Sequence, residues 1–356
     1  MLFSSASWRL MPMADPNRII AFDTSAQGRS YLLTPLAASI FVLFAGGSTV
    51  RDAETRLSAE MSDTDAFNQI VERLATHGLL SRWAPQPESS TEAQWKGMGW
   101  KSAWDFHLTV DGYPFFDYSA DGHKEDRRRM ARYRRDAPDP IDAIKLSVQN
   151  ASETVDNLDI RLQTMLTGAV YQHSEQSLGN VTVTAEAIDT LIDLAFSFRA
   201  LPGKLRRTSP SGGARHPIHG YLWQCRSVNG INEGIYEVTF PVPSLKEIRE
   251  TADSKVVLPG FYKPYSDFEP VSIVLLYSKF SRNRFRYREP RDFRAVLMDA
   301  GHLASTIQEI ARSQGLRAHI HHGVDEDRLD SLLGAECLED GFMIGVGIGH
   351  GGDSVV

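Results

Sequence analysis

The stretch Arg206–Pro217 carries residue types suited to holding a flat or anionic ligand. It reads Arg-Arg-Thr-Ser-Pro-Ser-Gly-Gly-Ala-Arg-His-Pro. Gly212 and Gly213 lack a Cβ, so the backbone can approach a ligand closely there, and Ser211 with successive backbone N–H groups can donate hydrogen bonds. Neither the G-x-G-x-x-G spacing of dinucleotide sites nor a Gly-Lys-Ser/Thr phosphate loop is present. The pattern indicates a ligand-binding turn; an ordinary surface turn is the alternative.

Other reactive residue types are less well placed for chemistry. The run His319-Ile320-His321-His322 lacks a neighbouring Asp, Glu or Cys motif, and on a strand His322 would face away from the other two, so we expect no metal site. Cys225 lies in an apolar stretch and is interpreted as a core residue. Ser211 is not in a G-x-S-x-G elbow, which argues against a hydrolase.

Composition narrows the possible classes of protein. The chain has 356 residues with a net charge of −7, which argues against a nucleic-acid binder. Two cysteines fit a reducing compartment. The apolar run 36–47 is too short to cross a bilayer, and no secretory signal is apparent. We expect a cytoplasmic protein with no membrane partner.

Turn and capping signals predict a small N-terminal module after a tail at residues 1–17. Strands at 18–22 and 30–33 precede a helix capped by Thr34, with Pro35 at its first position. Two more helices and a returning strand at 79–83 complete a winged-helix-like pattern. DNA binding is disfavoured by its charge, peptide recognition by strand addition is the functional interpretation, and simple packing against a neighbouring domain is the alternative.

A connecting region follows this module. Residues 85–92 are a polar linker, residues 95–118 are rich in aromatic side chains, and the run 124–135 is rich in arginine. The basic run is interpreted as a solvated helix face; a landing site for an acidic peptide or a phosphate is the alternative.

From about residue 165 helical and strand patterns are mixed. Helices are predicted at 185–198, 293–314 and 325–333, and strands at 220–225, 234–240, 272–277, 317–320 and 342–348. The unbroken apolar run 272–277 is typical of a strand buried on both faces.

The order of short motifs in this region resembles the flavin-dependent nitroreductase fold, in its SagB-type dehydrogenase branch. The motifs are Ser209-Pro210-Ser211-Gly212-Gly213-Ala214-Arg215-His216-Pro217, Gly234-Ile235-Tyr236, Arg286-Tyr287 before Phe293-Arg294, Asp299-Ala300-Gly301-His302, Gly315-Leu316 before His322-Gly323, and Asp330-Ser331-Leu332-Leu333-Gly334. The N-terminal module similarly resembles the PqqD-like element that binds leader peptides of ribosomally made, modified peptides.

The resemblance implies an FMN-dependent dehydrogenase that oxidises azolines to azoles in a ribosomally synthesised precursor peptide. It implies a homodimer with flavin sites at the subunit interface, and a possible cyclodehydratase partner. Pro210, Ser211, Gly212, Gly213 and Arg215 would cradle the flavin, and His322 and Gly323 would lie near its reactive nitrogen. A flavin enzyme acting on another peptide group is an alternative.

The proton step is assigned to Tyr287. Related enzymes have a Lys-Tyr pair where this chain has Arg286-Tyr287. Because arginine effectively keeps its proton, Arg286 is a poor base, but it would favour the phenolate of Tyr287. We therefore expect Tyr287 as base and Arg286 as electrostatic helper; ring packing without a catalytic role is the alternative.

A second departure concerns the cofactor phosphate. The family pattern R-R-S-x-R corresponds here to Gln172-His173-Ser174-Glu175-Gln176, so Ser174 remains between His173 and Gln176 without the arginines. A phosphate dianion needs compensating cations. Arg206, Arg207, Arg215 or Arg317 are the candidates, and a flavin-free peptide-binding scaffold is the alternative if none serves.

Taken together, the sequence predicts an α+β protein with a nitroreductase-like flavin domain preceded by a small winged-helix-like domain. Residues 1–90 are predicted to form the PqqD-like peptide-recognition module, 91–164 the aromatic and basic connecting arm, and 165–356 the FMN domain.

Overall fold

The computed structural model describes residues 1–4, 8–12, 17–23, 30–57, 63–82, 90–111, 121–150, 181–201, 204–249, 252–262 and 268–351. The chain divides into two compact units. The first holds Met1–Lys124 with Arg288–Arg291, and the second holds Glu125–Tyr287 with Asp292–Val356. The expected arm 91–164 thus contributes residues to both units, while the boundaries of the three predicted domains remain a prediction.

The first unit packs three helices against a small antiparallel sheet. The sheet has the order β2-β3-β4, with β2 at Trp8–Pro12, β3 at Ile19–Asp23 and β4 at Ser30–Leu33. The helices are α1 (Pro35–Leu43), α2 (Val50–Leu57) and α3 (Thr64–Thr76). Their apolar faces meet in one buried cluster that includes Trp8, Ile40, Phe44, Phe67 and Leu74.

The capping signals read from the sequence position these helices. The Thr34 side chain accepts a hydrogen bond from the Ala37 N–H at the start of α1, and Asp63 accepts one from the Ala66 N–H at the start of α3. Gly78, which follows α3, adopts a φ of +75°, the left-handed conformation that a glycine takes at a helix end at little cost.

The prediction of a tail at residues 1–17 was wrong. Phe3–Ser4 forms β1, which pairs with β5 at Leu80–Ser81, and Trp8 begins the edge strand β2. The Trp8 side chain is only 4% exposed, and its Nε1 donates to the Gly78 carbonyl at 3.1 Å. These strands are too short to show an alternating pattern, and their partners lie far away in the sequence, so local signals could not reveal them.

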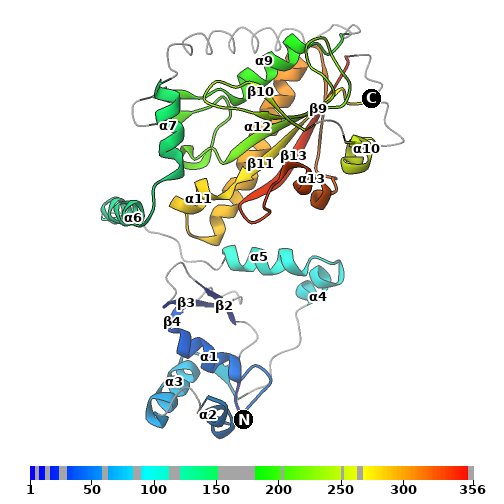
Figure 1. Ribbon diagram of the computed structural model, residues 1–356. Coiled ribbons are helices and arrows are strands. Elements are labelled where there is room, and N and C mark those ends of the chain that lie inside the picture. The colour runs from blue at the N-terminus through cyan, green and yellow to red at the C-terminus, as the bar shows by residue number, and fades with distance from the viewer. Residues whose placement is uncertain are drawn as a thin grey trace. The chain divides into compact units, whose positions relative to one another are not determined.

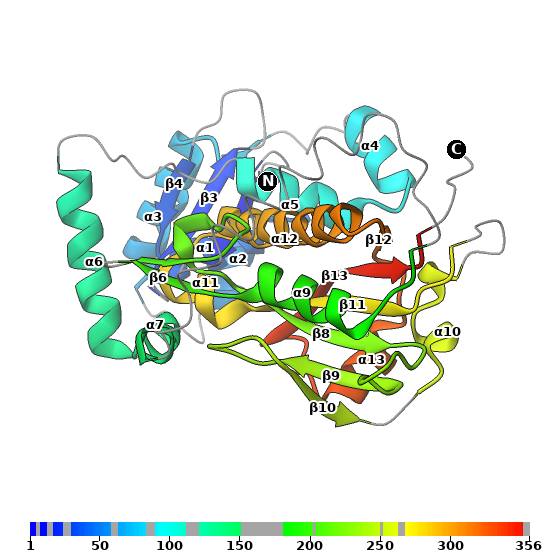
Figure 2. The same ribbon diagram turned by 90° about the horizontal axis from the view of Figure 1, so that it is seen from above.

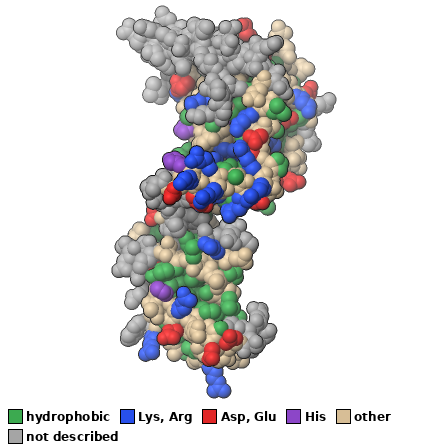
Figure 3. All heavy atoms as spheres, turned by 90° about the vertical axis from the view of Figure 1, so that its left-hand side faces the viewer, with side chains coloured by type: hydrophobic (Ala, Val, Ile, Leu, Met, Phe, Trp, Pro, Cys, Tyr) green, Lys and Arg blue, Asp and Glu red, His purple; other side chains and the backbone are tan. Residues whose placement is uncertain are grey.

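Helices also form the connecting region. The aromatic segment gives α4 (Ser90–Gly97) and α5 (Lys101–Asp111), where the Trp95 ring contacts the rings of Trp100, Trp104 and His107. The basic run lies in α6 (Gly122–Asp136). Figure 3 shows Lys and Arg side chains gathered over α6, and Arg127, Arg128, Arg132, Arg134 and Arg135 are exposed, as expected for a solvated helix face.

The second unit is built on a six-stranded sheet whose neighbouring strands are antiparallel (Figure 1). The strand order is β10-β9-β8-β11-β13-β12. The strands are β8 (Ile218–Gln224), β9 (Gly234–Val238), β10 (Leu245–Arg249), β11 (Ser272–Lys279), β12 (Arg317–His321) and β13 (Asp340–Gly349). A separate hairpin of β6 (Arg199–Leu201) and β7 (Lys204–Arg206) precedes β8. Residues 272–278 of β11 are all buried, as the apolar run predicts.

Alternating side chains of the sheet face two different helical layers. Leu222, Val274 and Leu276 pack with α9 (Ala185–Phe196) and the long helix α12 (Phe293–Ser313), which runs alongside β11 and β13 (Figure 2). Trp223 and Leu275 pack on the other face, against α10 (Ser254–Val257), the 3₁₀ turn Pro259–Phe261 and α13 (Glu326–Leu333). The fold class read from the sequence is confirmed.

Two further helices lie close to the start of β8. Helix α11 (Phe280–Arg286) follows β11, and α7 (Pro140–Asn150) packs on the β6–β7 hairpin. Ile141, Ile144 and Val148 of α7 join Phe198 and Leu205 in a small buried cluster.

Within the described ranges, we find no helix with the length and apolar character that crossing a membrane requires.

Candidate functional site

Residues 209–217, here called the glycine turn, lie immediately before β8 and are bonded to α12 through the carboxylate of Asp299. Ser211 Oγ donates to Asp299 Oδ2 at 2.6 Å, and the Gly212 N–H donates to Asp299 Oδ1 at 3.1 Å. Ser211 Oγ also accepts from the His216 N–H at 2.8 Å. Burial raises the pKa of Asp299, and the bonds from Ser211 and Gly212 oppose that rise. Ser211 therefore holds the shape of the turn.

Tyr287 lies against this turn. Gly213 has a φ of +61°, and a Cβ added there would overlap the Tyr287 hydroxyl. Ala214 and His216 also have positive φ angles, 53° and 44°, which side-chain-bearing residues rarely adopt. Backbone of this kind persists only where the surroundings enforce it, and such residues cluster at ligand sites.

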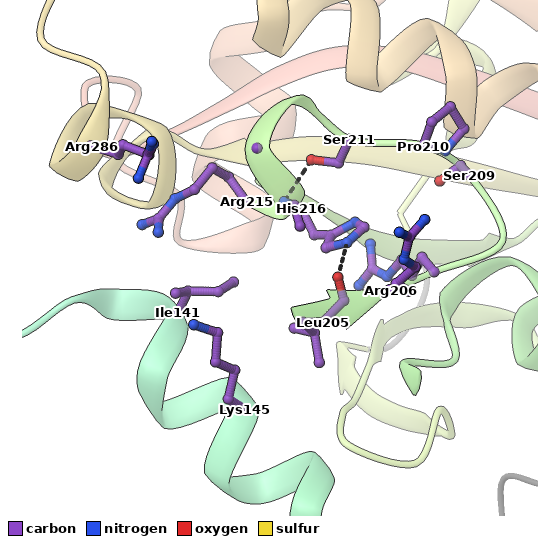
Figure 4. A pocket seen from close by; sticks show the side chains of 13 residues that line it. Ile141, Lys145, Leu205, Arg206, Ser209, Pro210, Ser211, Arg215, His216 and Arg286 are labelled. Atoms are coloured by element: carbon purple, nitrogen blue, oxygen red, sulfur yellow. Dashed lines mark hydrogen bonds between the residues drawn. The ribbon is translucent and has the colours of Figure 1, made fainter. Parts of the chain in front are cut away.

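A cavity of about 500 Å³ opens on the turn (Figure 4). Its lining residues come from α7, the end of β7, the turn itself and the end of α11: Ile141, Lys145, Leu205, Arg206, Arg207, Ser209, Pro210, Ser211, Gly213, Ala214, Arg215, His216 and Arg286. Five of these side chains are cationic and none is acidic, although the whole chain carries a net charge of −7. A cavity of this size and charge suits an anionic small molecule.

Two of the lining arginines are committed to the fold. Arg215 is buried and forms a two-pronged ion pair with Asp139 at 2.6 and 2.9 Å, while its Nε donates to the Arg282 carbonyl. Arg207 donates to the carbonyls of Phe196 and Ile218, and its guanidinium lies 4.1 Å from the centre of the Phe198 ring. Neither guanidinium is free to turn toward a ligand.

The buried charge beneath the turn is not balanced. Arg207, Arg215 and Arg282 are cationic. In the described part of this region the buried carboxylates are Asp139, which pairs with Arg215, and Asp299, which bonds to the turn, so three cations stand against two acids. Burial, with a smaller effect from Arg282, lowers the pKa of Arg207 to about 9, so that it stays protonated at neutral pH. Burial and the charge of Arg207 lower the pKa of His216 to about 3, so His216 is neutral and donates to the Leu205 carbonyl. The surplus positive charge favours an anion in the cavity.

Arg286 places a further positive charge at the edge of the cavity, beside the Tyr287 ring. The Arg286 guanidinium pairs with Asp126 at 3.0 Å and lies 5.4 Å from the centre of the Tyr287 ring. Burial lowers the pKa of Arg286, but Tyr287 and Asp126 together hold it above its ordinary value. Arg286 is therefore a fixed positive charge beside the tyrosine, and its role as an electrostatic helper stays a prediction.

His322 and Gly323 follow β12 and do not line the cavity. The registers of β8, β11, β13 and β12 place the turn and His322 toward the same end of the sheet, with three strand spacings, about 14 Å, between the strands β8 and β12. Gly323 donates its N–H to His321 Nδ1 at 2.8 Å, and His322 is exposed and stacks on His321.

Arg317 begins β12 at the opposite end of the sheet and lies 5.6 Å from the Phe268 ring centre. The predicted positions His173, Ser174 and Gln176 lie outside the described residues. No cluster of His, Cys, Asp or Glu side chains suitable for a metal ion occurs in the parts of the chain that the structure describes.

Several residues of the site were not predicted. Among them, Asp139, Ile141 and Lys145 belong to the segment interpreted only as connecting arm, Leu205 was not singled out, and Asp299 was noted in a motif without a role. Asp139 also accepts from the Ile141 N–H at 3.2 Å, the pattern of a helix cap. That capping signal was readable before Pro140, but its pairing with Arg215, 76 residues away, was not.

Much of the second unit matches a known protein family. Residues 171–350, about half of the chain, match the model of the nitroreductase family. The chain belongs to the nitroreductase family. The matched residues include the whole six-stranded sheet, the glycine turn and Tyr287.

Two individual proteins show similarity to this chain at below 30% identity. The trifolitoxin-processing protein TfxB of Rhizobium leguminosarum bv. trifolii is 26% identical over 250 residues, which is 65% of each chain. A putative nitroreductase of Methanocaldococcus jannaschii is 29% identical over 31% of this chain and 54% of that protein. The chain thus spans less than two thirds of either relative.

Among solved structures, the Escherichia coli microcin synthetase McbBCD complex with truncated pro-MccB17 bound includes a similar chain. It is 22% identical, covers 51% of this chain and 71% of that chain, and superposes with a TM-score of 0.41.

The residues of this nitroreductase site fit a flavin mononucleotide. Asp299 fixes the turn, and the cavity lining holds five cationic side chains, no acidic one, and apolar residues such as Leu205 and Pro210. Pro210, Ser211 and Gly213 would line the cofactor, and the surplus positive charge suits its phosphate.

Proposed function

We propose that this protein is an FMN-dependent dehydrogenase that oxidises a ribosomally synthesised peptide, converting azoline rings to azoles. The observation that carries the proposal is the cationic cavity on the glycine turn, with the Tyr287 hydroxyl lying against that turn. Membership of the nitroreductase family and the likeness to a trifolitoxin-processing protein support a flavin cofactor and a peptide substrate.

The chemistry divides between cofactor and chain. FMN, when bound, supplies an acceptor for the hydride that leaves a substrate carbon. The chain supplies the base for the proton lost with it, and we assign that role to Tyr287. Arg286, fixed by Asp126, places a positive charge beside the Tyr287 ring.

The first unit offers a surface for the precursor peptide. A groove of about 390 Å³ lies between β4 and α3 and is lined by Tyr31, Leu32, Leu33, Thr34, Ala37, Ile70, Arg73, Leu74, His77 and Leu79. In the described sheet β4 is one of the two edge strands, so its outer backbone groups can pair with an added strand. We propose that this PqqD-like groove, apolar with Arg73 and His77 along it, binds the leader segment.

The assembly is part of the same proposal. We propose a homodimer, in which His322 and Gly323, exposed or half-exposed at the end of β12, would reach the cofactor of the partner subunit. A cyclodehydratase that forms the azoline is the proposed partner enzyme, since azolines must be made before they are oxidised.

The activity can be tested on a peptide that carries a preformed azoline. Incubation with the purified protein and FMN is expected to lower the peptide mass by two hydrogens, detected by mass spectrometry. Tyr287→Phe removes the proposed base and is expected to reduce the rate by about 10²–10⁴-fold while FMN stays bound. Tyr236→Phe is the matched control, because within the described residues its hydroxyl donates only to the Asn232 carbonyl. Full activity of Tyr287→Phe would remove this residue from the mechanism.

A further inference from the structure

We propose that Lys145 of α7 and Arg206 at the end of β7 form the phosphate site of this chain, holding a phosphate monoester in the cavity. The inference rests on the proposed flavin cofactor and deepens it by naming the residues that take its charge. It also places α7, a helix outside the region matched by the family model, in the binding site.

The first step is that α7 is fixed against the turn. Asp139, directly before α7, holds Arg215 of the turn through the buried two-pronged pair. Ile144 and Val148 anchor α7 in the cluster with Leu205. Lys145 follows Ile141 by four residues, so both lie on the helix face that lines the cavity.

The second step is to ask which lining cations retain charge for a ligand. Arg207 is held by bonds from Nε and Nη1 to two carbonyls, and all three side-chain nitrogens of Arg215 donate to Asp139 or to a carbonyl. Arg286 is paired with Asp126 and stacks on Tyr287. These three are therefore occupied.

Lys145 and Arg206 are different. Lys145 lies 3.3 Å from Asp142, a half-exposed carboxylate that it shares with Arg134 at 3.7 Å, so this one acid faces two cations. Arg206 is exposed and has no hydrogen bond or ion pair from its side chain within the described residues. Figure 4 shows the two side chains at the same cavity, one from α7 and one from the β7 end.

The third step identifies the ligand. The cavity has no acidic lining residue, and the buried arginines beneath it carry surplus positive charge. A dianion with several acceptor oxygens satisfies two flexible cationic donors at once. A phosphate monoester has that charge and those oxygens, and the same chemistry is present in the FMN tail and in free phosphate.

The test compares FMN with riboflavin, which is the same ring without the phosphate, by quenching of flavin fluorescence on the flavin-stripped full-length protein. Lys145→Gln and Arg206→Gln are each expected to weaken FMN binding about 10-fold and to leave riboflavin binding unchanged. Lys145→Arg keeps the charge and is expected to restore most of the affinity. Lys124→Gln is the matched control, because Lys124 makes the same kind of exposed pair with Asp121 three residues away.

Two further measurements use the wild-type protein and do not depend on variant folding. Added salt is expected to weaken FMN binding more than riboflavin binding, and inorganic phosphate is expected to compete with FMN but not with riboflavin. Equal loss of both flavins in the variants, or no loss of either, would overturn the phosphate site while the flavin proposal stood. Failure of both flavins to bind the wild-type protein would overturn the flavin proposal and the phosphate site together.

Discussion

At the scale of single residues, the site depends on a close contact between Gly213 and Tyr287. The tyrosine hydroxyl occupies the space that any side chain at position 213 would need. The glycine is required twice, once for its positive φ and once for this contact. Tyr287, the proposed base, can therefore occupy its position only because residue 213 has no side chain.

Gly213→Ala should accordingly reduce stability and disturb Tyr287. The strained backbone and the overlap are expected to cost about 1–3 kcal/mol in free energy of unfolding. In the Tyr287→Phe background the loss should be smaller, since the hydroxyl that causes the overlap is gone. A double-mutant cycle measured by denaturant unfolding checks this; strictly additive losses would show that the two residues do not touch.

Individual residue roles were predicted unevenly from the sequence. Arg286 and Tyr287 are neighbours in the sequence, so their proximity could be predicted, and in the structure the Arg286 guanidinium lies beside the Tyr287 ring. Arg207 and Arg215 were expected to hold a ligand, yet their donors go to carbonyls and to Asp139. Sequence reasoning identifies a cation, but its partner depends on tertiary packing that local patterns do not encode.

At the scale of elements, strong periodic patterns gave correct helices and strands. The helix predicted at 293–314 is α12 at Phe293–Ser313, and the strand predicted at 272–277 is β11. The strand β10 (Leu245–Arg249) was not predicted, because it is a polar edge strand with Lys246 and Glu247 in its middle. Burial of a strand requires apolar residues whose pattern can be recognised in the sequence. An exposed edge strand does not need these residues and so lacks the pattern.

The cavity is lined by both α7 and the glycine turn, and the pair between Asp139 and Arg215 holds these two segments together. Asp139→Asn removes the negative charge that faces buried Arg215, and leaving a buried cation unpaired is expected to cost about 3–5 kcal/mol. Thermal unfolding checks the size of the loss. Asp142→Asn, which alters an exposed pair of the same helix, is the control and should cost under about 1 kcal/mol.

The same pair predicts a pH dependence. Burial raises the pKa of Asp139, but Arg215 and the Ile141 N–H hold it below its ordinary value of 3.8. A lowered native pKa means that the stabilisation is present above that ordinary value and is lost as the pH falls through the native one. The wild-type unfolding temperature should therefore drop more steeply below about pH 4 than that of Asp139→Asn. Parallel curves for the two proteins in this window would contradict the assignment.

At the scale of the whole molecule, the proposal divides the work between peptide recognition in the first unit and oxidation in the second. The groove beside β4 and the cationic cavity have opposite characters, one mainly apolar and one charged. A substitution in the groove should therefore leave flavin binding intact, and a substitution in the cavity should leave peptide binding intact.

Leu32→Asp tests that separation, because Leu32 is 55% exposed and lines the groove. The charge should weaken binding of the precursor peptide about 10-fold, measured by fluorescence anisotropy, and leave the FMN content unchanged. Val42→Asp on α1 is the matched control, since Val42 is 57% exposed and does not line the groove. Equal peptide affinity in Leu32→Asp and wild type would place the leader elsewhere.

The most direct test of the central claim is the amount of flavin released from the purified protein on denaturation. Protein loaded with FMN and freed of excess by gel filtration is expected to release close to one FMN per chain, identified by chromatography and absorbance. A folded protein that retains no FMN after incubation with a large excess would contradict the claim that the glycine turn and its cationic cavity form a flavin site.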